Sequence, residues 1–148
     1  MIFLCDLMLG KLVKYLRILG FDTIYITSVA ELDRYKDEYS PPIFFTKRRK
    51  QKVPYSNCIF IESNDVFSQL SQIRDIIKPH INGKTLMKRC IQCNIPLNDA
   101  EKDDIEGLVP EFIFHTYSIF RTCPVCRKVY WKGSHAEHME KWIKEITS

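Results

Sequence analysis

Four cysteines in the C-terminal half are the residues best suited to chemistry in this chain. They form two CxxC pairs, Cys90-x-x-Cys93 and Cys123-x-x-Cys126, with 29 residues between the pairs. Four thiolates match the tetrahedral preference of Zn²⁺, and a CxxC turn lets two sulfurs reach the same ion. The spacing predicts a structural zinc site, because four protein ligands leave no coordination position open for catalysis. The alternatives are two disulfides or a redox CxxC, and a reducing cytosol disfavours both.

Residues next to these pairs bear on the same region. Asn94 follows the first pair, and Asn tolerates the left-handed backbone conformation that such turns often need. Arg127 holds the matching position after the second pair. His135 and His138 are three residues apart on one predicted helix face, so they could form a second metal pair. Histidines at the start of a helix are more often ordinary surface groups, and the spacing does not decide between the two roles.

Three acidic residues follow predicted strands in the N-terminal half. Asp6 comes directly after an apolar strand, Glu31 lies after the second strand, and Asp65 lies after the fourth. The carboxyl ends of parallel strands lie along one edge of a sheet, where ligands usually bind, so these side chains could converge there. Grouped carboxylates hold Mg²⁺ or Mn²⁺, which activate water and stabilise a phosphoryl transition state.

Each of these acids also has a simpler explanation. Glu31 completes a capping box that begins at Ser28, and Asp65 suits the first turn of a helix. Asp6 is harder to explain in this way, because a carboxylate directly after a buried strand needs a partner or an ion. The spacing alone therefore makes the acid cluster a hypothesis.

A run of cations follows the third predicted strand. In IFFTKRRKQK (43–52), three apolar residues precede Lys47, Arg48, Arg49, Lys50 and Lys52. Most charge runs are solvated surface, but cations at the ligand edge of a sheet also suit the phosphates of a nucleic acid. The net charge of +4 is modest, so the position of these cations, and not the overall balance, suggests RNA as a partner.

Alternating strand and helix patterns position these residues. Short apolar or β-branched runs predict strands at 2–5, 23–27, 43–45 and 58–61. Periodicity and capping patterns predict helices at about 8–19, from Ser28 toward Tyr39, from Ser63 or Asn64 to Pro79, and from Ser134 onward. This order is typical of an α/β protein with a mostly parallel sheet.

The chain changes character near residue 80. Residues 79–89 are typical of a linker, and strand-like segments at 117–120 and 128–131 accompany the cysteine pairs. We therefore expect an α/β domain over residues 1–80 and a small zinc ribbon with a C-terminal helix over residues 81–148.

The composition is that of a soluble globular protein. A chain of 148 residues with 45% hydrophobic and 27% charged residues can bury a core. No apolar run approaches the roughly 20 residues that a membrane span needs. The apolar segment 1–5 is too short for a signal peptide. We therefore expect a cytoplasmic protein that does not associate with membranes.

Four stretches of the sequence resemble the Mut-7 C-terminal RNase domain family, a PIN-like fold that carries a zinc ribbon. They are FLCDLMLGKLVKYLRILGFDT (3–23), IFFTKRR (43–49), RCIQCNIPL (89–97) and TCPVCRKVYWKGSH (122–135). The resemblance covers essentially the whole chain, and the first and last stretches are the most specific. It implies a PIN-like sheet flanked by helices and metal-dependent cleavage of single-stranded RNA by acids at the sheet edge.

The resemblance also implies roles for single residues. By position, Asp6 matches the first acid of the family, and Glu31 falls near the second, with Asp33 as an alternative. Asp65 is the nearest candidate for a later acid. These residues would hold the catalytic Mg²⁺ or Mn²⁺.

One position departs from the family pattern. Where the family reads Leu-Thr-Arg-Asp at the end of the third strand, this chain has Phe-Thr-Lys-Arg, so Arg48 replaces an acid. A guanidinium cannot bind a cation and stays charged, so Arg48 could neutralise the neighbouring carboxylates. It could instead contact a phosphate.

Three functions remain open at this point. The first is a metal-dependent ribonuclease that uses the remaining acids. The second is an inactive pseudonuclease that binds RNA through the cations of residues 47–52 and of the ribbon. The third is a protein-interaction module that uses the ribbon, which the sequence does not directly support.

Overall fold

The computed structural model describes residues 1–49 and 53–147 and divides the chain into two compact units. The first, here called the sheet unit, contains residues 1–16 and 21–80. The second, here called the cysteine unit, begins at Ile81 and also includes Arg17–Gly20. The sequence did not suggest this inclusion, because residues 17–20 continue the periodic pattern of the helix before them.

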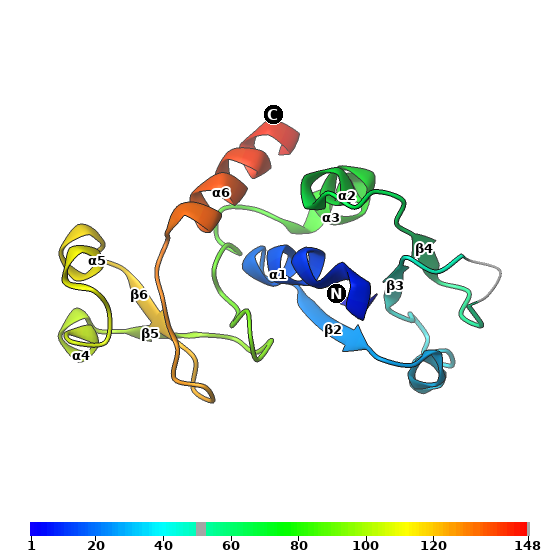
Figure 1. Cartoon of the computed structure of the whole chain (residues 1–148), viewed down its shortest axis with the longest axis horizontal. Helices are drawn as coiled ribbons and strands as arrows, with labels where there is room; N and C mark the ends of the chain where they lie inside the picture. The colour runs from blue at the N-terminus through cyan, green and yellow to red at the C-terminus, as the bar shows by residue number, and fades with distance from the viewer. Residues whose placement is uncertain (50–52, 148) are drawn as a thin grey trace. The chain divides into compact units, whose positions relative to one another are not determined.

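The sheet unit is built on four parallel strands (Figure 1). They are β1 (Ile2–Asp6), β2 (Asp22–Ile26), β3 (Ile43–Thr46) and β4 (Cys58–Phe60), in the spatial order β2-β1-β3-β4. This arrangement confirms the expected mostly parallel α/β sheet. Because β1 and β3 are neighbours with parallel register, the residues that follow them emerge side by side at the carboxyl edge.

Both faces of this sheet are buried, as is usual for parallel strands. Leu4 and Phe44 are register partners, and both belong to a hydrophobic cluster that includes Leu32. Phe3 and Phe45 point to the opposite face, with their ring centroids 5.1 Å apart. These five side chains are at most 1% exposed, so the core holds the strand ends in a defined register.

The helical segments as far as His80 are short. They are η1 (Leu7–Leu9), α1 (Gly10–Ile18), η2 (Val29–Arg34), α2 (Val66–Gln72), α3 (Arg74–Ile77) and η4 (Lys78–His80), where η marks a 3-10 helix. The helix expected from Ser28 toward Tyr39 is only η2, which buries Leu32 alone. A short polar segment gains too little from packing to continue as a helix.

The helix expected before Pro79 differs in two ways. Its N-cap is Asp65, and not Ser63 or Asn64 as predicted. It breaks at Ile73, whose backbone angles (φ −101°, ψ 8°) leave the helical region. Pro79 lies within η4 instead of ending the helix, because a proline near the start of a helical turn loses no internal hydrogen bond.

The cysteine unit carries a three-stranded antiparallel sheet and three helices. They are β5 (Asn98–Ala100), α4 (Lys102–Ile105), α5 (Glu111–Thr116), β6 (Phe120–Thr122), β7 (Val129–Tyr130) and α6 (Ser134–Thr147), with strand order β5-β6-β7. The strand predicted at 117–120 in fact begins only at Phe120. The sequence missed β5, α4 and α5, because segments of three to six residues show no clear periodicity.

The C-terminal helix α6 is the best-predicted element of the cysteine unit. It begins at Ser134 as expected and buries Met139, Trp142, Ile143 and Ile146 at helical spacing. In the part of the chain that the structure describes, no helix combines the length and apolar character needed to cross a membrane.

Candidate functional site

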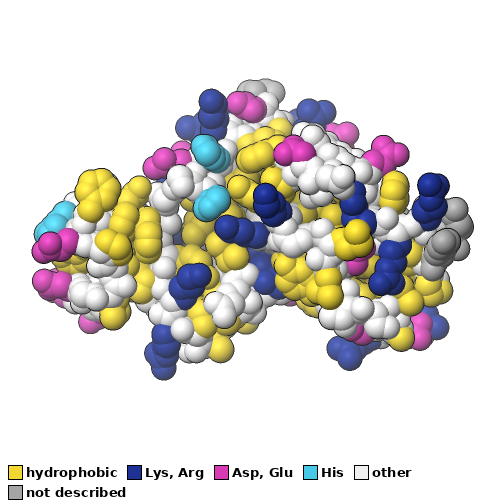
Figure 2. All heavy atoms as spheres, in the orientation of Figure 1, with side chains coloured by type: hydrophobic (Ala, Val, Ile, Leu, Met, Phe, Trp, Pro, Cys, Tyr) yellow, Lys and Arg dark blue, Asp and Glu magenta, His cyan; other side chains and the backbone are white. Residues whose placement is uncertain are grey.

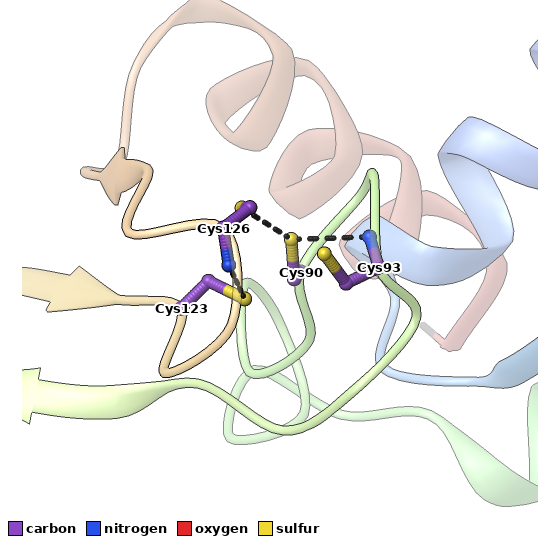
Figure 3. Close-up of side chains that lie close together, drawn as sticks. All are labelled: Cys90, Cys93, Cys123 and Cys126. Carbon is purple, nitrogen blue, oxygen red and sulfur yellow. Dashed lines mark hydrogen bonds between the residues drawn. The ribbon is translucent and has the colours of Figure 1, made fainter.

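The two CxxC pairs come together as the sequence predicts (Figure 3). The four sulfur atoms all lie within 4.8 Å of one another, and the Sγ atoms of Cys90 and Cys126 are 3.7 Å apart. A tetrahedral zinc site with Zn–S bonds of about 2.3 Å has sulfur–sulfur edges of about 3.8 Å. No disulfide joins the six cysteines, so four thiols of the right geometry are free to hold one metal ion.

The backbone builds both pairs in the same way. Asn94 (φ 59°) and Arg127 (φ 66°) adopt the left-handed conformation that the sequence predicted for these positions. Each donates its N–H to the carbonyl of the first cysteine of its pair, at 2.9 and 3.0 Å. The two turns are therefore equivalent knuckles. They point two sulfurs each at a common centre.

Backbone donors also reach the sulfur atoms. The N–H groups of Cys93 and Cys126 lie 3.3 and 3.4 Å from the Sγ of Cys90 and Cys123. Burial raises the pKa of the Cys93 thiol to about 12. Burial also opposes ionisation of Cys123, but the N–H groups of Cys126 and Val125 lower its pKa to about 6. Cys93 and Cys123 thus differ in acidity, and a bound cation would be needed to ionise Cys93 at neutral pH.

Two side chains that no motif in the sequence indicates, Tyr130 and Arg17, support the first knuckle. The hydroxyl of Tyr130 lies 3.1 Å from Cys90 Sγ and accepts the N–H of Ile91 at 3.1 Å. Arg17, only 8% exposed, donates Nη1 to the carbonyl of Ile91 at 2.6 Å. Arg17 is therefore a buried cation and not part of the solvated surface of its helix. This contact explains why the end of α1 belongs to the cysteine unit.

Asp6 occupies the end of β1, where it is only 4% exposed. Its Oδ2 accepts hydrogen bonds from Thr46 Oγ1 at 2.7 Å and from the Lys47 N–H at 2.9 Å. Its Oδ1 accepts the N–H of Met8 at 3.0 Å. The partners that a buried carboxylate requires are thus the end of β3 and the first turn of η1. A carboxylate has about four acceptor sites, so one remains for a cation or a further donor.

Glu31 and Asp65 have local roles in the structure. Glu31 Oε1 accepts hydrogen bonds from the N–H and hydroxyl of Thr27, and the hydroxyl lowers the pKa of Glu31 below its ordinary value. Asp65 Oδ2 accepts the N–H of Ser68 at 3.0 Å as the N-cap of α2. The alternative acid Asp33 is exposed and pairs with Lys36 at 3.4 Å.

These acids are not gathered into one cluster with Asp6. Among the described residues, the four cysteines are the only group of three or more Cys, His, Asp or Glu side chains whose ligand atoms lie together. His135 and His138 likewise belong to no such group. The second metal pair suggested for them therefore lacks a third ligand in the described part of the chain.

The basic run divides into two parts. Lys47 Nζ donates to the carbonyls of Glu62 and Ser63 at 2.9 and 3.0 Å, so this cation closes the loop that follows β4. Arg48 and Arg49 are exposed, and the guanidinium of Arg48 makes no hydrogen bond or ion pair with another described residue. Lys50 and Lys52 lie outside the described residues.

The backbone of Arg48 joins the network around Asp6. Its N–H donates at 2.9 Å to Thr46 Oγ1, and that hydroxyl in turn donates to Asp6. Two hydrogen bonds through the Thr46 hydroxyl therefore link the backbone of Arg48, the residue that stands where an acid was expected, to the buried carboxylate. On the face drawn in Figure 2, Lys and Arg side chains are interspersed with apolar and neutral surface and form no single patch.

Comparison with known proteins gives one result. Residues 1–143 match the family described as the Mut7-C RNAse domain. No curated protein and no solved structure matches the chain. Because the match spans essentially the whole chain, including Asp6 and the cysteine knuckles, this protein belongs to the Mut7-C RNAse domain family.

Proposed function

We propose that this protein is a ribonuclease that cleaves single-stranded RNA and that cleavage depends on Asp6. Family membership supports a ribonuclease-like function. The observation that carries the proposal is the position of Asp6, a nearly buried carboxylate at the carboxyl edge of a parallel sheet, where ligands of such sheets bind. Thr46 and Lys47 hold its Oδ2, which orients the second oxygen for another ligand.

Mg²⁺ or Mn²⁺ is the cofactor that we propose for cleavage. Mg²⁺ keeps several waters and is commonly bound by one or two carboxylates plus substrate phosphates, so a group of three acids is not required. Asp6 offers one open acceptor site, and Asp65 Oδ1 has no partner among the described residues. When bound, the ion would activate water and offset charge on the phosphate.

Arg48 favours a second candidate function, RNA binding without cleavage. It replaces an expected acid, and its charged side chain is exposed beside the Asp6 network. Arginine suits bidentate contact with phosphate, and Arg49 is exposed next to it. Lys47 and Lys50 complete the RNA contacts that we propose, and Lys47 has one N–H left after its two carbonyl partners.

We further propose that the four cysteines hold a structural Zn²⁺. A complete set of four thiolates selects zinc or iron among common metals, and two equivalent knuckles are typical of zinc ribbons. The ion would hold together a three-stranded sheet of short strands that buries little apolar surface by itself.

One experiment separates the two candidate functions. Labelled single-stranded RNA is incubated with the full chain in Mg²⁺ or Mn²⁺, and both cleavage and binding are measured. The ribonuclease proposal expects Asp6→Asn to abolish cleavage while binding persists, and Asp37→Asn, an exposed acid away from the strand ends, to change neither. Arg48→Asp should raise cleavage by restoring an acid.

The same measurements identify the alternative. If the wild-type chain binds RNA but shows no cleavage that Asp6→Asn removes, the protein is an RNA-binding pseudonuclease. In that case Arg48→Asp should weaken binding, and affinity should fall steeply with salt, because each neutralised phosphate releases counterions. If the wild-type chain neither binds nor cleaves RNA, both functions are excluded.

A further inference from the structure

The cysteine unit contains a cavity of about 190 Å³ that the knuckles and the acids do not explain. Residues that line it include Met87, Ile119, Arg121, Tyr130, Trp131 and Lys132. The volume is below the roughly 300–1,000 Å³ of pockets for drug-sized ligands, so the cavity suits one flat ring and not a large molecule. Its lining combines two aromatic residues with two cations.

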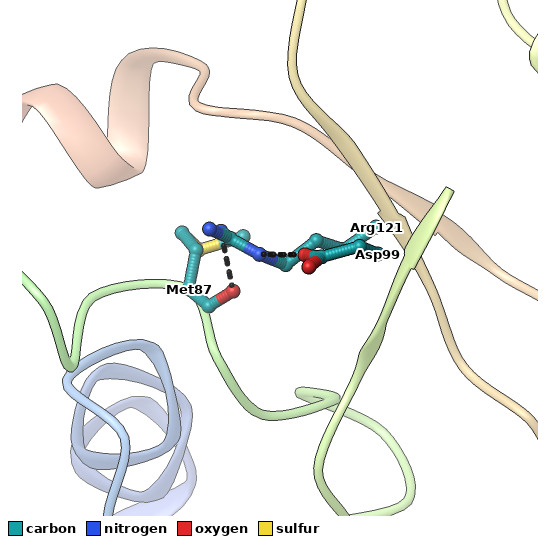
Figure 4. Close-up of polar contacts among 3 residues, drawn as sticks. All are labelled: Met87, Asp99 and Arg121. Carbon is teal, nitrogen blue, oxygen red and sulfur yellow. Dashed lines mark hydrogen bonds and ion pairs between the residues drawn. The ribbon is translucent and has the colours of Figure 1, made fainter. Parts of the chain in front are cut away.

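Arg121 is held at the cavity with donors to spare (Figure 4). Its Nε lies 3.3 Å from Asp99 Oδ1, and its Nη1 donates to the Met87 carbonyl at 3.1 Å. These two contacts use two of the five N–H groups of the guanidinium. Asp99 is 87% exposed, so solvent screens its charge and the pair neutralises Arg121 only weakly. Arg121 is thus a positioned cation that can still bind an anion.

Trp131 is half-buried and fixed by its neighbours. Gly133 lies against the indole, since a Cβ on that glycine would be 3.2 Å from Nε1 and 3.6 Å from Cδ1 of Trp131. The Gly133 N–H also donates to the Trp131 carbonyl at 2.9 Å. Tyr130 beside it is anchored through its hydroxyl to Cys90 Sγ. A glycine and a cysteine knuckle therefore keep two aromatic side chains in place at the cavity.

Lys132 connects this cavity to a second and more open one. The second cavity, of about 390 Å³, is lined by Lys132, Lys141 and Lys144, with Tyr117, Glu137 and Glu140. Glu140 pairs with Lys132 and lies 3.6 Å from Lys144, whereas Lys141 has no such partner among the described residues. Two of these three cations share Glu140, and Lys141 is the cation left unpaired beyond the aromatic cavity in the described part of the chain.

We infer that this cavity binds one nucleotide of single-stranded RNA, with the base stacked on Trp131 and the adjoining phosphates bound by Arg121 and Lys132. Sequence-tolerant binding of single strands uses this combination of aromatic platforms and flanking cations. The next phosphate would pass toward Lys141 and Lys144. The inference rests on the proposed function, because RNA is the ligand that the family membership brings to this chain. It adds a binding site on the cysteine unit, separate from the residues of the sheet edge.

The test measures binding of a fluorescently labelled oligouridylate to the full chain and to matched variants. Trp131→Ala should weaken binding about tenfold or more, and Trp131→Phe should restore part of the loss, since a smaller ring can still stack. Lys132→Met should weaken binding and reduce its salt dependence. The controls are Phe112→Ala, an aromatic residue 74% exposed outside the cavity, and Lys88→Met, an exposed cation of the same unit.

Two further readouts guard against misfolding. Bound zinc and the circular dichroism spectrum should match the wild type in Trp131→Phe.

In wild type, RNA should quench tryptophan emission, and Trp131→Phe should remove that response because the remaining tryptophan, Trp142, is buried in α6. In cleavage assays, Trp131→Ala should raise KM more than it lowers kcat.

The outcomes distinguish this site from the proposed function. If Trp131→Ala and Lys132→Met bind and cleave RNA like the wild type, the nucleotide site is wrong and the ribonuclease proposal stands. If the wild type binds RNA through these residues but never cleaves it, the site stands and catalysis fails. If the wild type does not bind RNA, both are overturned.

Discussion

The cysteine knuckles and the strand-end acids were both predicted as metal-binding groups, but the fold gathers only the cysteines into one group. The cysteines come from two short turns that share one backbone geometry, and all four sulfurs lie within 4.8 Å of one another. Asp6 ends β1, Glu31 lies in η2 and Asp65 caps α2, and the three do not form a comparable group. Ligands paired within a single turn are placed by local conformation, whereas ligands from separate strands depend on every packing contact between them.

The two groups also differ in how their negative charges are balanced. The knuckles have four like ligands that repel one another as thiolates and need a cation between them. Asp6 is already satisfied by three protein donors and is stable without a metal. We therefore expect metal removal to disrupt the cysteine unit and to leave the carboxylate network at the sheet edge intact.

The largest effect is expected from the loss of one knuckle ligand. Cys123→Ser should abolish stoichiometric zinc binding and unfold the cysteine unit, because a structural zinc contributes about 10–16 kcal/mol in small zinc-binding peptides. Metal content by atomic emission and proteolysis of the full chain measure both effects. Cys58→Ala, a buried cysteine of β4, is the control and should retain one zinc. Full zinc occupancy in Cys123→Ser would contradict the assignment of the site.

The next largest effect is expected from the loss of Asp6. Asp6→Ala leaves Thr46, Lys47 and Met8 without their acceptor and should lower the free energy of unfolding by about 3 kcal/mol. Asp65→Ala removes only a helix cap and should cost about 1 kcal/mol. Urea denaturation measures both values. Equal losses in the two variants would show that Asp6 has no special structural role.

A smaller effect is expected where the end of α1 supports the first knuckle. Arg17→Met removes a charged hydrogen bond to the Ile91 carbonyl and should cost about 2 kcal/mol. It should also speed the release of zinc to a chelator. Lys11→Met, an exposed cation on the same helix, is the control. Identical zinc release in the two variants would mean that Arg17 does not position the knuckle.

The smallest effect concerns the protonation of Glu31. The Thr27 hydroxyl holds the pKa of Glu31 below its ordinary value of 4.5. A lowered pKa in the folded state stabilises the protein at neutral pH, and this contribution disappears as the pH falls through the folded-state pKa. Thr27→Val should therefore move the pKa back toward 4.5, as followed by NMR titration of the side-chain carboxyl. An unchanged pKa would refute the assigned cause.

The strands were predictable because each is a short apolar or β-branched run, and a parallel sheet buried on both faces requires such runs. The knuckles were predictable because the CxxC spacing and the residue after it define the turn, as Asn94 and Arg127 illustrate. The short elements β5, α4 and α5 were not, since too few residues form them for a period to show. The break at Ile73 also escaped prediction, because the apolar stripe continues across it.

The candidate sites divide in the same way. The sequence by itself determined that four cysteines would share one site, that Asp6 would follow a buried strand, and that Arg48 would stand where an acid was expected. Only the tertiary structure decided that Thr46 would satisfy Asp6, that Arg17 and Tyr130 would support a knuckle, and that Trp131 and Arg121 would share a cavity. The order of residues along the chain fixes their spacing within one turn or strand. Contacts between distant segments arise only when the core packs and sets their register.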